Sequence, residues 1–373
     1  MQTASVASNS TSSARRLSSS IRSSKDRLFR KSCPRSMTPA TQEACQRRRQ
    51  PACTMLGRMT VSFSPGSFLS LSSGGFHRIA YADWGKHSAS QVVVCVHGLS
   101  RNCRDFDYLA RDLAQTCRVV CPDVVGRGDS EWLADKSDYR FSTYLSDAAA
   151  LIARITAPAP PVAFGTIRGP HKFAAGPAQI DWVGTSMGGL IGMLLAAKRG
   201  TPIRRLVLND VGAFISWGSL YRLKGYVAGG GAFKSAAEVE AYLRDACAPF
   251  GPLTDEQWHH LAKHSAAAGE DSRFHLRYDP AIGDTMRVNS PDPELPLGPN
   301  FLAGIDLWST WAEVRCPTLV LRGAESDVLS RDTLARMRAL RPGTEVLELP
   351  GVGHAPALMS YDQIAAVREF LLR

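Results

Sequence analysis

Short apolar runs alternate along the chain with longer stretches in which apolar residues recur every three or four positions. The runs have the length and β-branched content of buried strands, and they cover residues 61–71, 76–84, 91–96, 118–122, 179–183, 204–208, 317–321 and 345–349. Helical spacing is found at residues 104–115, 141–155, 187–198, 331–340 and 361–372. Two strands that can pair as a hairpin, followed by repeated strand–helix units, predict an α/β fold with a mostly parallel sheet and helices on both faces.

Two regions interrupt this alternation. Residues 157–178 are rich in Pro and Gly and predict a long surface loop. Residues 213–310 hold helical patterns at 235–247 and 255–268, followed by a Pro/Gly-rich stretch at 280–299. An insertion of this kind between the sixth and seventh strands is predicted to form a cap over the mouth of the sheet.

The first 58 residues differ from the rest in composition. They hold 12 of the 44 Lys and Arg residues and two of the 34 acidic ones, so the net charge of +10 belongs to this segment and the remainder is neutral. Rich in Ser and Arg and without apolar periodicity, residues 1–58 are predicted to be a disordered tail, with a transit peptide or an over-extended start as alternatives. The core is then predicted at residues 59–212 and 311–373, around the 213–310 cap.

Several classes of protein are disfavoured by composition. No apolar run approaches the ~20 residues of a membrane-spanning helix. The neutral body argues against a nucleic-acid partner. The nine cysteines show no regular spacing, which favours a reducing compartment and predicts neither a disulfide framework nor a zinc site. No motif for another metal or an organic cofactor is present.

The central motif is Gly184-Thr185-Ser186-Met187-Gly188. An apolar strand-like run leads into it and an apolar helical run leads out. This is the strand, sharp turn and helix that a nucleophile elbow requires, and Gly184 and Gly188 leave out side chains that would collide in the turn. Ser186 is therefore predicted to be a catalytic nucleophile.

A serine hydroxyl needs a base to take its proton, and the base needs an orienting acid. His354 has the best context, in a glycine-rich loop just before the last helix. The acid is expected between Ser186 and His354 in the chain. Asp327, in the loop after the seventh predicted strand, is preferred because it is close to His354 in the chain. Asp210, at the end of the sixth, is the alternative.

The segment that ends the third predicted strand is expected to form an oxyanion hole. Buried Val94-Cys95-Val96 leads into His97-Gly98-Leu99. The N–H groups of Leu99 and of Met187, the residue after the nucleophile, are predicted to point at the developing oxyanion. Since His97 precedes Ser186 in the chain, it is interpreted as a structural loop residue and not as the base.

The predicted cap carries a further pattern. Arg273, His275 and Arg277 alternate with apolar residues, which would place two cations and an imidazole on one face of an extended segment. One hypothesis is that this face attracts an acidic substrate group, and the alternative is a solvated edge.

Together these motifs resemble the α/β-hydrolase superfamily over about residues 60–373. The segment 123–130 (DVVGRGDS) resembles the family's G-x-G-x-S turn after the fourth strand. Segments 97–106, 208–212 and 351–356 are similar to uncharacterised bacterial esterase-like serine hydrolases with a cap domain, a subgroup that also resembles enol-lactone and carbon–carbon-bond hydrolases. The resemblance implies an eight-stranded α/β-hydrolase fold, a cap and the catalytic roles given above.

The sequence thus predicts an enzyme that cleaves a small carboxylic ester, lactone or thioester through an acyl-enzyme on Ser186. Haloalkane dehalogenases and epoxide hydrolases of this fold carry Asp at the elbow, so Ser186 argues against both. A carbon–carbon-bond hydrolase of a dienoic keto acid and a ligand receptor with a slow triad are the alternatives. The partners expected are the substrate and water, in the cytoplasm, or in an organelle if residues 1–58 are a transit peptide. The oligomeric state is not predicted.

Overall fold

The computed structural model describes residues 62–156, 179–228, 231–285 and 304–373. The predicted tail at 1–58 and the predicted loop at 157–178 lie outside the described residues, as does most of the Pro/Gly-rich stretch at 280–299. Within the described part, no helix has both the length and the apolar character that crossing a membrane requires.

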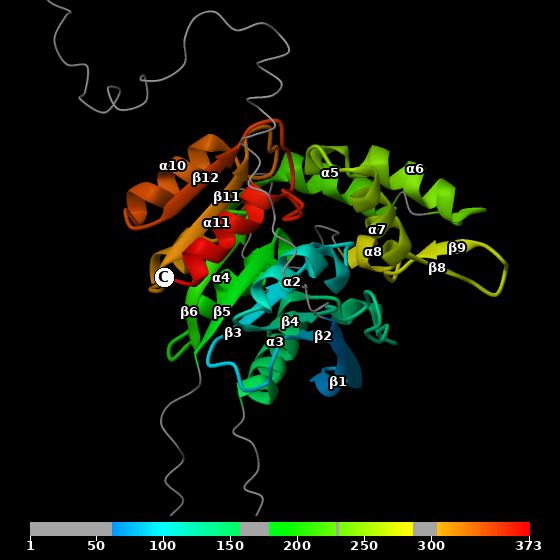
Figure 1. Ribbon diagram of the computed structural model, residues 1–373, viewed down its shortest axis with the longest axis horizontal. Helices are drawn as coiled ribbons and strands as arrows, with labels where there is room; N and C mark the ends of the chain where they lie inside the picture. Colours follow the sequence, from blue (N-terminus) through cyan, green and yellow to red (C-terminus); the bar gives the residue numbers. More distant parts are fainter. Residues whose placement is uncertain (1–61, 157–178, 229–230, 286–303) are drawn as a thin grey trace, which may run out of the picture. The chain divides into compact units, whose positions relative to one another are not determined.

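One eight-stranded sheet organises the chain, with the strands in the order β1-β2-β4-β3-β5-β6-β11-β12 (Figure 1). The strands are β1 (Phe63–Ser72), β2 (Gly75–Trp84), β3 (Val92–Val96), β4 (Arg118–Pro122), β5 (Ile180–Thr185), β6 (Ile203–Asn209), β11 (Thr318–Gly323) and β12 (Glu345–Leu349). The pairs β1–β2 and β2–β4 are antiparallel and the remaining pairs are parallel. All eight predicted strands are therefore present, and the predicted hairpin forms the antiparallel edge.

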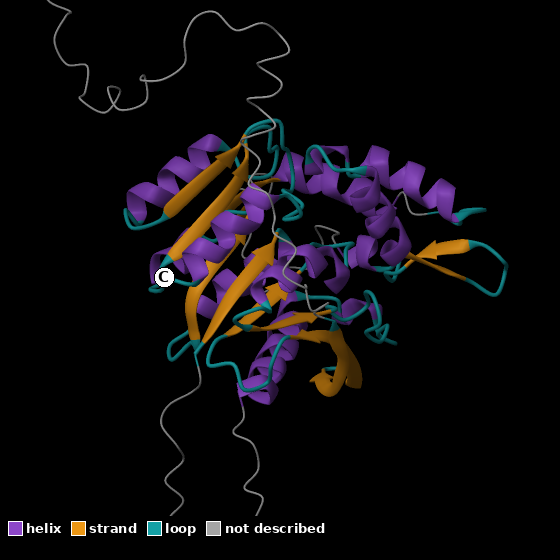
Figure 2. Cartoon of the chain, viewed as in Figure 1, coloured by secondary structure: helices purple, strands orange, loops and turns teal. Residues whose placement is uncertain are grey.

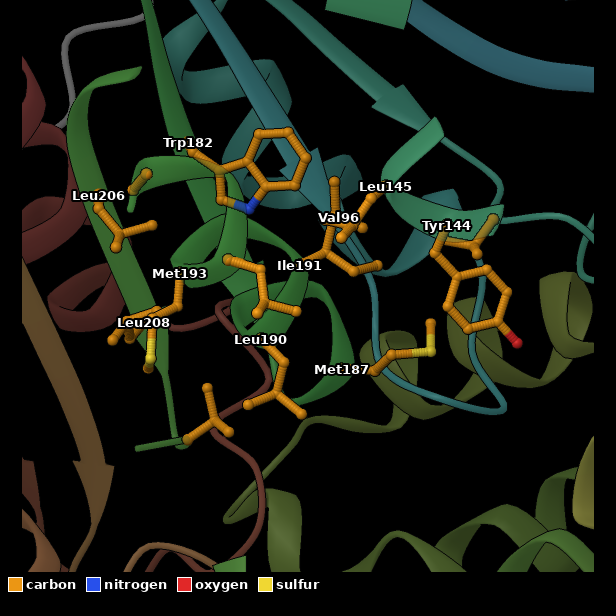
Figure 3. Packing of buried hydrophobic residues seen from close by; sticks show 14 of the residues in the cluster. Val96, Tyr144, Leu145, Trp182, Met187, Leu190, Ile191, Met193, Leu206 and Leu208 are labelled. Carbon is orange, nitrogen blue, oxygen red and sulfur yellow. The ribbon is translucent and has the colours of Figure 1, made fainter. Parts of the chain in front are cut away.

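Helices cover both faces of the sheet because its strands are apolar on both sides. Along β3 the buried side chains alternate between two core clusters, Val94 and Val96 facing one and Val93 and Cys95 the other. The first cluster includes residues of the helices α3 (Phe141–Thr156), α4 (Met187–Ala196), α9 (Trp308–Glu313) and α10 (Arg331–Leu340), and the second includes residues of α2 (Asp107–Leu113) and α11 (Tyr361–Leu371). Figure 3 shows Trp182 of β5 in the first cluster, among side chains of α4 and β6.

Between β6 and β11 the chain leaves the sheet. The elements there are β7 (Phe214–Ser216), α5 (Trp217–Ala228), α6 (Ala236–Ala246), the 3₁₀ turn η3 (Ala248–Phe250), α7 (Asp255–Ser265), β8 (Ala266–Ala268), β9 (Phe274–Leu276), α8 (Ile282–Thr285), β10 (Gly304–Asp306) and α9. Helices α5 to α8 lie together beside the sheet (Figures 1 and 2). They include a third buried apolar cluster that holds Val239, Leu243 and Trp258. We call residues 213–310 the insertion.

Candidate active site

Ser186 lies on the sharp turn between β5 and α4. Its backbone adopts φ 51° and ψ −115°, a conformation that residues with a side chain rarely take and that marks strain at functional sites. A Cβ on Gly184 would lie 2.2 Å from the carbonyl oxygen of Gly188, and a Cβ on Gly188 would lie 2.0 Å from that of Val96. Both positions therefore require glycine, and the predicted elbow geometry is present.

His354 reaches Ser186 from the loop between β12 and α11. Its Nε2 lies 2.9 Å from the Oγ of Ser186, within hydrogen-bond distance of the proton that a base must accept. The loop is tied to the insertion, because the N–H of Gly353 donates to the carbonyl of Pro249 at 2.7 Å. The pairing of Ser186 and His354 that the sequence predicts is therefore found in the structure.

The other side of the imidazole faces Asp210, not Asp327. Nδ1 of His354 lies 2.8 Å from Oδ2 of Asp210, whose side chain is fully buried. Asp210 follows β6 directly and has a φ of 56°, a left-handed conformation that Asp tolerates better than most residues. Asp210, the alternative acid of the prediction, is thus the carboxylate that contacts His354.

The prediction that Asp327 pairs with His354 is wrong. Asp327 is about half exposed, with 47% of its side chain accessible, and its carboxylate accepts from Nε of Arg222 at 2.7 Å. Its loop follows β11, which lies one strand further from Ser186 than β6 does in the sheet order. Proximity to His354 along the chain was the wrong criterion, because Asp327 pairs with Arg222 while Asp210, further away in the chain, contacts the imidazole.

The loop after β11 instead supports Asp210. The N–H of Gly323 donates to Oδ1 of Asp210 at 2.9 Å, and the hydroxyl of Ser326 donates to Oδ2 at 2.6 Å. With His354 the carboxylate has three hydrogen-bond partners, which is how a buried charge is stabilised. These supporting residues were not found from the sequence, and Ser326 carries no motif that would have indicated them.

The segment after β3 is fixed beside the nucleophile. Buried His97 donates from Nδ1 to the carbonyl of Gly98 at 2.7 Å and accepts at Nε2 from the N–H of Val124 at 2.9 Å. Burial lowers the pKa of His97 to about 4, so the imidazole is neutral. The carbonyl of Leu99 accepts from Nε of Arg127 at 2.9 Å. His97 therefore has the structural role expected of it.

The predicted oxyanion donors lie next to Ser186. Leu99 lines the same cavity as the nucleophile, and Met187 is the first residue of α4, where helix N–H groups lack partners within the helix. Neither N–H donates a hydrogen bond to a described residue. Both are thus available to a ligand.

A cavity of about 340 Å³ opens beside Ser186 and His354. Apolar and aromatic groups form most of its wall on the side of the insertion, namely Tyr242, Leu243, Ala246, Cys247, Pro249, Phe250, Leu276 and Tyr278. The side formed by the sheet loops adds Gly98, Leu99, Ser100, Arg101 and Thr185, and Arg222, Glu325 and Asp327 supply further charged groups. A mainly apolar cavity with a few polar groups is typical of a site for a small molecule.

The sequence model of the alpha/beta hydrolase family matches residues 93–367. The chain belongs to this family. It is 39% identical to a 3-hydroxybutyrate-oligomer hydrolase of Cupriavidus necator, over 84% of this chain and 99% of the relative.

Two solved structures show the same fold. An alpha/beta hydrolase of Novosphingobium aromaticivorans is 34% identical, with a TM-score of 0.68 over 83% of this chain and 98% of that one. A putative hydrolase of Rickettsia typhi is 27% identical, with a TM-score of 0.71 over 83% and 99%. The family and fold predicted from the sequence are thereby confirmed.

The cations that the sequence singled out in this alpha/beta hydrolase lie elsewhere. Arg273, His275 and Arg277 flank or belong to β9, and none of them lines the cavity. Arg277 forms an ion pair with Asp129, and His275 pairs with Asp271 at 3.0 Å. This agrees with the solvated edge that was the alternative interpretation.

One group among the described residues brings possible metal ligands together: Asp107, His260 and His264 have ligand atoms within 4.8 Å of one another. Arg104 already occupies this group. It binds Asp107 through Nη2 at 2.5 Å, and its Nη1 lies 3.2 Å from Nδ1 of His264. The guanidinium supplies the positive charge that a metal would bring, so this cluster joins the sheet side to α7 through protein groups.

Proposed function

We propose that this alpha/beta hydrolase is a serine esterase that cleaves the ester bonds of 3-hydroxybutyrate oligomers. The observation that carries the proposal is the connected set Ser186–His354–Asp210, with contacts of 2.9 and 2.8 Å. The substrate class is supported by the 39% identical relative named for this activity, which the chain matches over 99% of its length.

The contacts suit acyl transfer to water. Ser186 attacks the ester carbonyl while Nε2 of His354 accepts its proton, and the buried charge of Asp210 stabilises the imidazolium and holds Nδ1–H in place. The acyl–oxygen bond breaks and the proton passes from His354 to the departing alkoxide. Water, deprotonated by His354, then attacks the acyl carbonyl, and His354 returns the proton to Oγ of Ser186 as the acyl–enzyme bond breaks.

The N–H groups of Leu99 and Met187 are the donors that we assign to the oxyanion. The backbone of Leu99 is held in place before reaction, because its carbonyl and the neighbouring side chain of His97 are hydrogen-bonded, and that of Met187 is held as the first residue of α4. Fixed donors stabilise developing charge without reorganising, and one such donor is commonly worth about 10²- to 10³-fold in rate.

We further propose that the insertion, residues 213–310, acts as the cap on a core formed by residues 59–212 and 311–373. Its residues Tyr242, Leu243 and Phe250 line the cavity, and Pro249 contacts the loop of His354. Such a wall suits the methyl-bearing backbone of an oligoester, which has ester oxygens as its main polar groups.

The test is release of 3-hydroxybutyrate from its dimer and trimer, followed by chromatography. The protein should cleave both, and Ser186→Ala should lower turnover by at least ~10³-fold, since the serine forms the covalent intermediate. Equal melting temperatures of the two proteins would show that the fold is intact.

A protein that cleaves neither oligomer but hydrolyses p-nitrophenyl esters would keep the esterase mechanism and contradict the substrate. Undiminished turnover by folded Ser186→Ala would contradict the mechanism itself.

A further inference from the structure

Arg101 is a largely buried cation in the wall of the cavity. Its side chain is 11% exposed, and it follows the Gly98-Leu99 segment by two residues. A methyl group placed on Gly98 would lie 3.7 Å from Cβ of Ser186 and 3.8 Å from Cγ of Arg101. Cβ of the nucleophile and Cγ of Arg101 therefore both lie within 4 Å of the position that a Cβ on Gly98 would take.

The guanidinium is held in one orientation. Nε and Nη2 donate to the two carboxylate oxygens of Asp105 at 2.8 and 2.7 Å, a side-on bidentate pair. Although burial by itself lowers the pKa of Arg101, the charge of Asp105 raises it above its usual value, so the group is cationic. Nη1, on the side away from Asp105, donates to no described residue.

Side chains of the insertion lie near Arg101 in the cavity wall. The guanidinium carbon lies 5.8 Å from the ring centre of Phe250, and Cys247 and Tyr278 line the same cavity. The other arginine in the wall, Arg222, is half exposed and paired with Asp327. Arg101 is thus the arginine of this wall that presents spare donors in apolar surroundings.

We propose that Nη1 of Arg101 binds the free carboxylate at the acid end of the oligomer, so that Ser186 cleaves the ester next to that end. This inference rests on the proposed function. In the terminal unit, four covalent bonds separate the carboxylate carbon from the scissile carbonyl carbon, a span of roughly 5 Å. Arg101 suits so short a span, because its Cγ lies close to the nucleophile and its side chain lines the same cavity.

Binding of the oligomer's terminal carboxylate by Arg101 determines which ester is cleaved and therefore which products form. The acyl–oxygen bond of the terminal ester breaks, the shortened oligomer is carried on Ser186, and one 3-hydroxybutyrate leaves with the proton from His354. Water then releases the shortened oligomer, whose new carboxylate can bind Arg101 in the next cycle. The enzyme therefore removes one monomer at a time from the acid end.

The test compares the 3-hydroxybutyrate dimer as the free acid with the same dimer as its methyl ester, in the full chain. The key variant is the double substitution Arg101→Gln with Asp105→Asn, because loss of Arg101 alone would leave an unpaired carboxylate that repels the acid. Since a charge-assisted hydrogen bond is lost, the ratio of kcat/KM for acid over ester should fall by at least about tenfold.

Two further variants complete the design. Arg277→Gln with Asp129→Asn removes an ion pair outside the cavity wall, and the ratio should stay at its parental value. Arg101→Lys keeps the charge and the partner Asp105 but loses the planar fork, and it should give an intermediate ratio. An unchanged ratio, or acid and ester rates that fall in parallel, would overturn the proposal.

Binding separates this inference from the proposed function. In Ser186→Ala, calorimetry should show tighter binding of the acid than of the methyl ester, and the double substitution should abolish the difference. If the parent cleaves neither dimer, the proposed function fails while this difference still supports carboxylate binding. Equal affinities, or no binding of either dimer, overturn the role of Arg101.

Discussion

Asp210 and Asp327 follow neighbouring strands of the same sheet, yet their surroundings are opposite. The carboxylate of Asp210 is fully buried and accepts from His354, Gly323 and Ser326. That of Asp327 is 47% exposed and pairs with the half-exposed Arg222. Burial strengthens an electrostatic interaction, and exposure screens it. We therefore assign the role of the acid in the proposed mechanism to Asp210 and not to Asp327.

The two carboxylates follow strands at different places in the sheet. Strand β6 is the neighbour of β5, which carries Ser186 at its end, and β11 is one position further away. Asp210, directly after β6, contacts His354, whereas Asp327 in the loop after β11 lines the same cavity but pairs with Arg222. The contacts of each carboxylate, and not its distance from His354 along the chain, therefore decide which acid we assign to the base.

The largest effect on turnover is expected for Asp210→Asn. An amide does not balance the imidazolium and favours the wrong tautomer, so turnover should fall by roughly 10²- to 10⁴-fold. The measurement is kcat with the 3-hydroxybutyrate dimer, with the melting temperature as the control for folding. A folded variant with nearly full activity would remove Asp210 from the mechanism.

His97 is a second buried polar group at this edge of the sheet. Its burial should make the stability of the fold depend on pH. Burial lowers its pKa in the folded protein from 6.5 to about 4. Between these values the unfolded chain binds more protons, so stability falls as the pH drops from about 6.5 to about 4, by on the order of 3 kcal/mol.

The control for this pH effect is His97→Gln, which keeps a donor and an acceptor but does not titrate. Its unfolding free energy at neutral pH should be lower than that of the parent, with a shallower loss toward pH 4. Denaturant titrations at several pH values measure both slopes. Identical slopes would mean that His97 is not held neutral by the fold.

A smaller effect sharpens the contrast between the two loops. Ser326→Ala removes the hydroxyl that donates to Asp210, and we expect kcat to fall about tenfold because one charge-assisted hydrogen bond is lost. Ser219→Ala is the matched control, since its hydroxyl donates to the carbonyl of Asp327 at 2.6 Å. Equal losses of kcat in the two variants would show that the hydrogen bond from Ser326 to Asp210 does not contribute specifically to turnover.

The smallest effect is expected for the exposed pair. Asp327→Asn leaves Arg222 in water, and exposed ion pairs contribute about 0–1 kcal/mol to stability. The melting temperature should change little, and kcat for the dimer should stay within about threefold of the parental value. A 100-fold loss of kcat would indicate that Asp327 takes part in catalysis.

Local patterns were sufficient to predict the eight strands of the sheet and two residues of the Ser186–His354–Asp210 set. The eight strands follow from buried apolar runs, and the elbow follows from glycines that the turn requires. His354 was predicted because its glycine-rich loop comes after the last strand. These features depend on residues close together in the chain.

What the sequence could not predict depends on contacts between distant segments. The choice between Asp210 and Asp327 depends on which side chain meets the imidazole, and the support from Ser326 depends on the packing of one loop on another. The place of Arg101 in the cavity wall depends on the insertion folding over it, about 150 residues later, and no local pattern indicates it. The short elements β7, β10 and α9 lack a long periodic pattern.

The most direct test of the Ser186–His354–Asp210 arrangement is the rate at which a fluorophosphonate labels the protein, with the modified residue located by mass spectrometry. The parent, Asp210→Asn and Asp327→Asn are compared at equal reagent concentration. We predict an adduct on Ser186 in the parent, labelling at least about 100-fold slower in Asp210→Asn, and a nearly parental rate in Asp327→Asn. An adduct elsewhere, or the opposite ranking of the two folded variants, would contradict this arrangement.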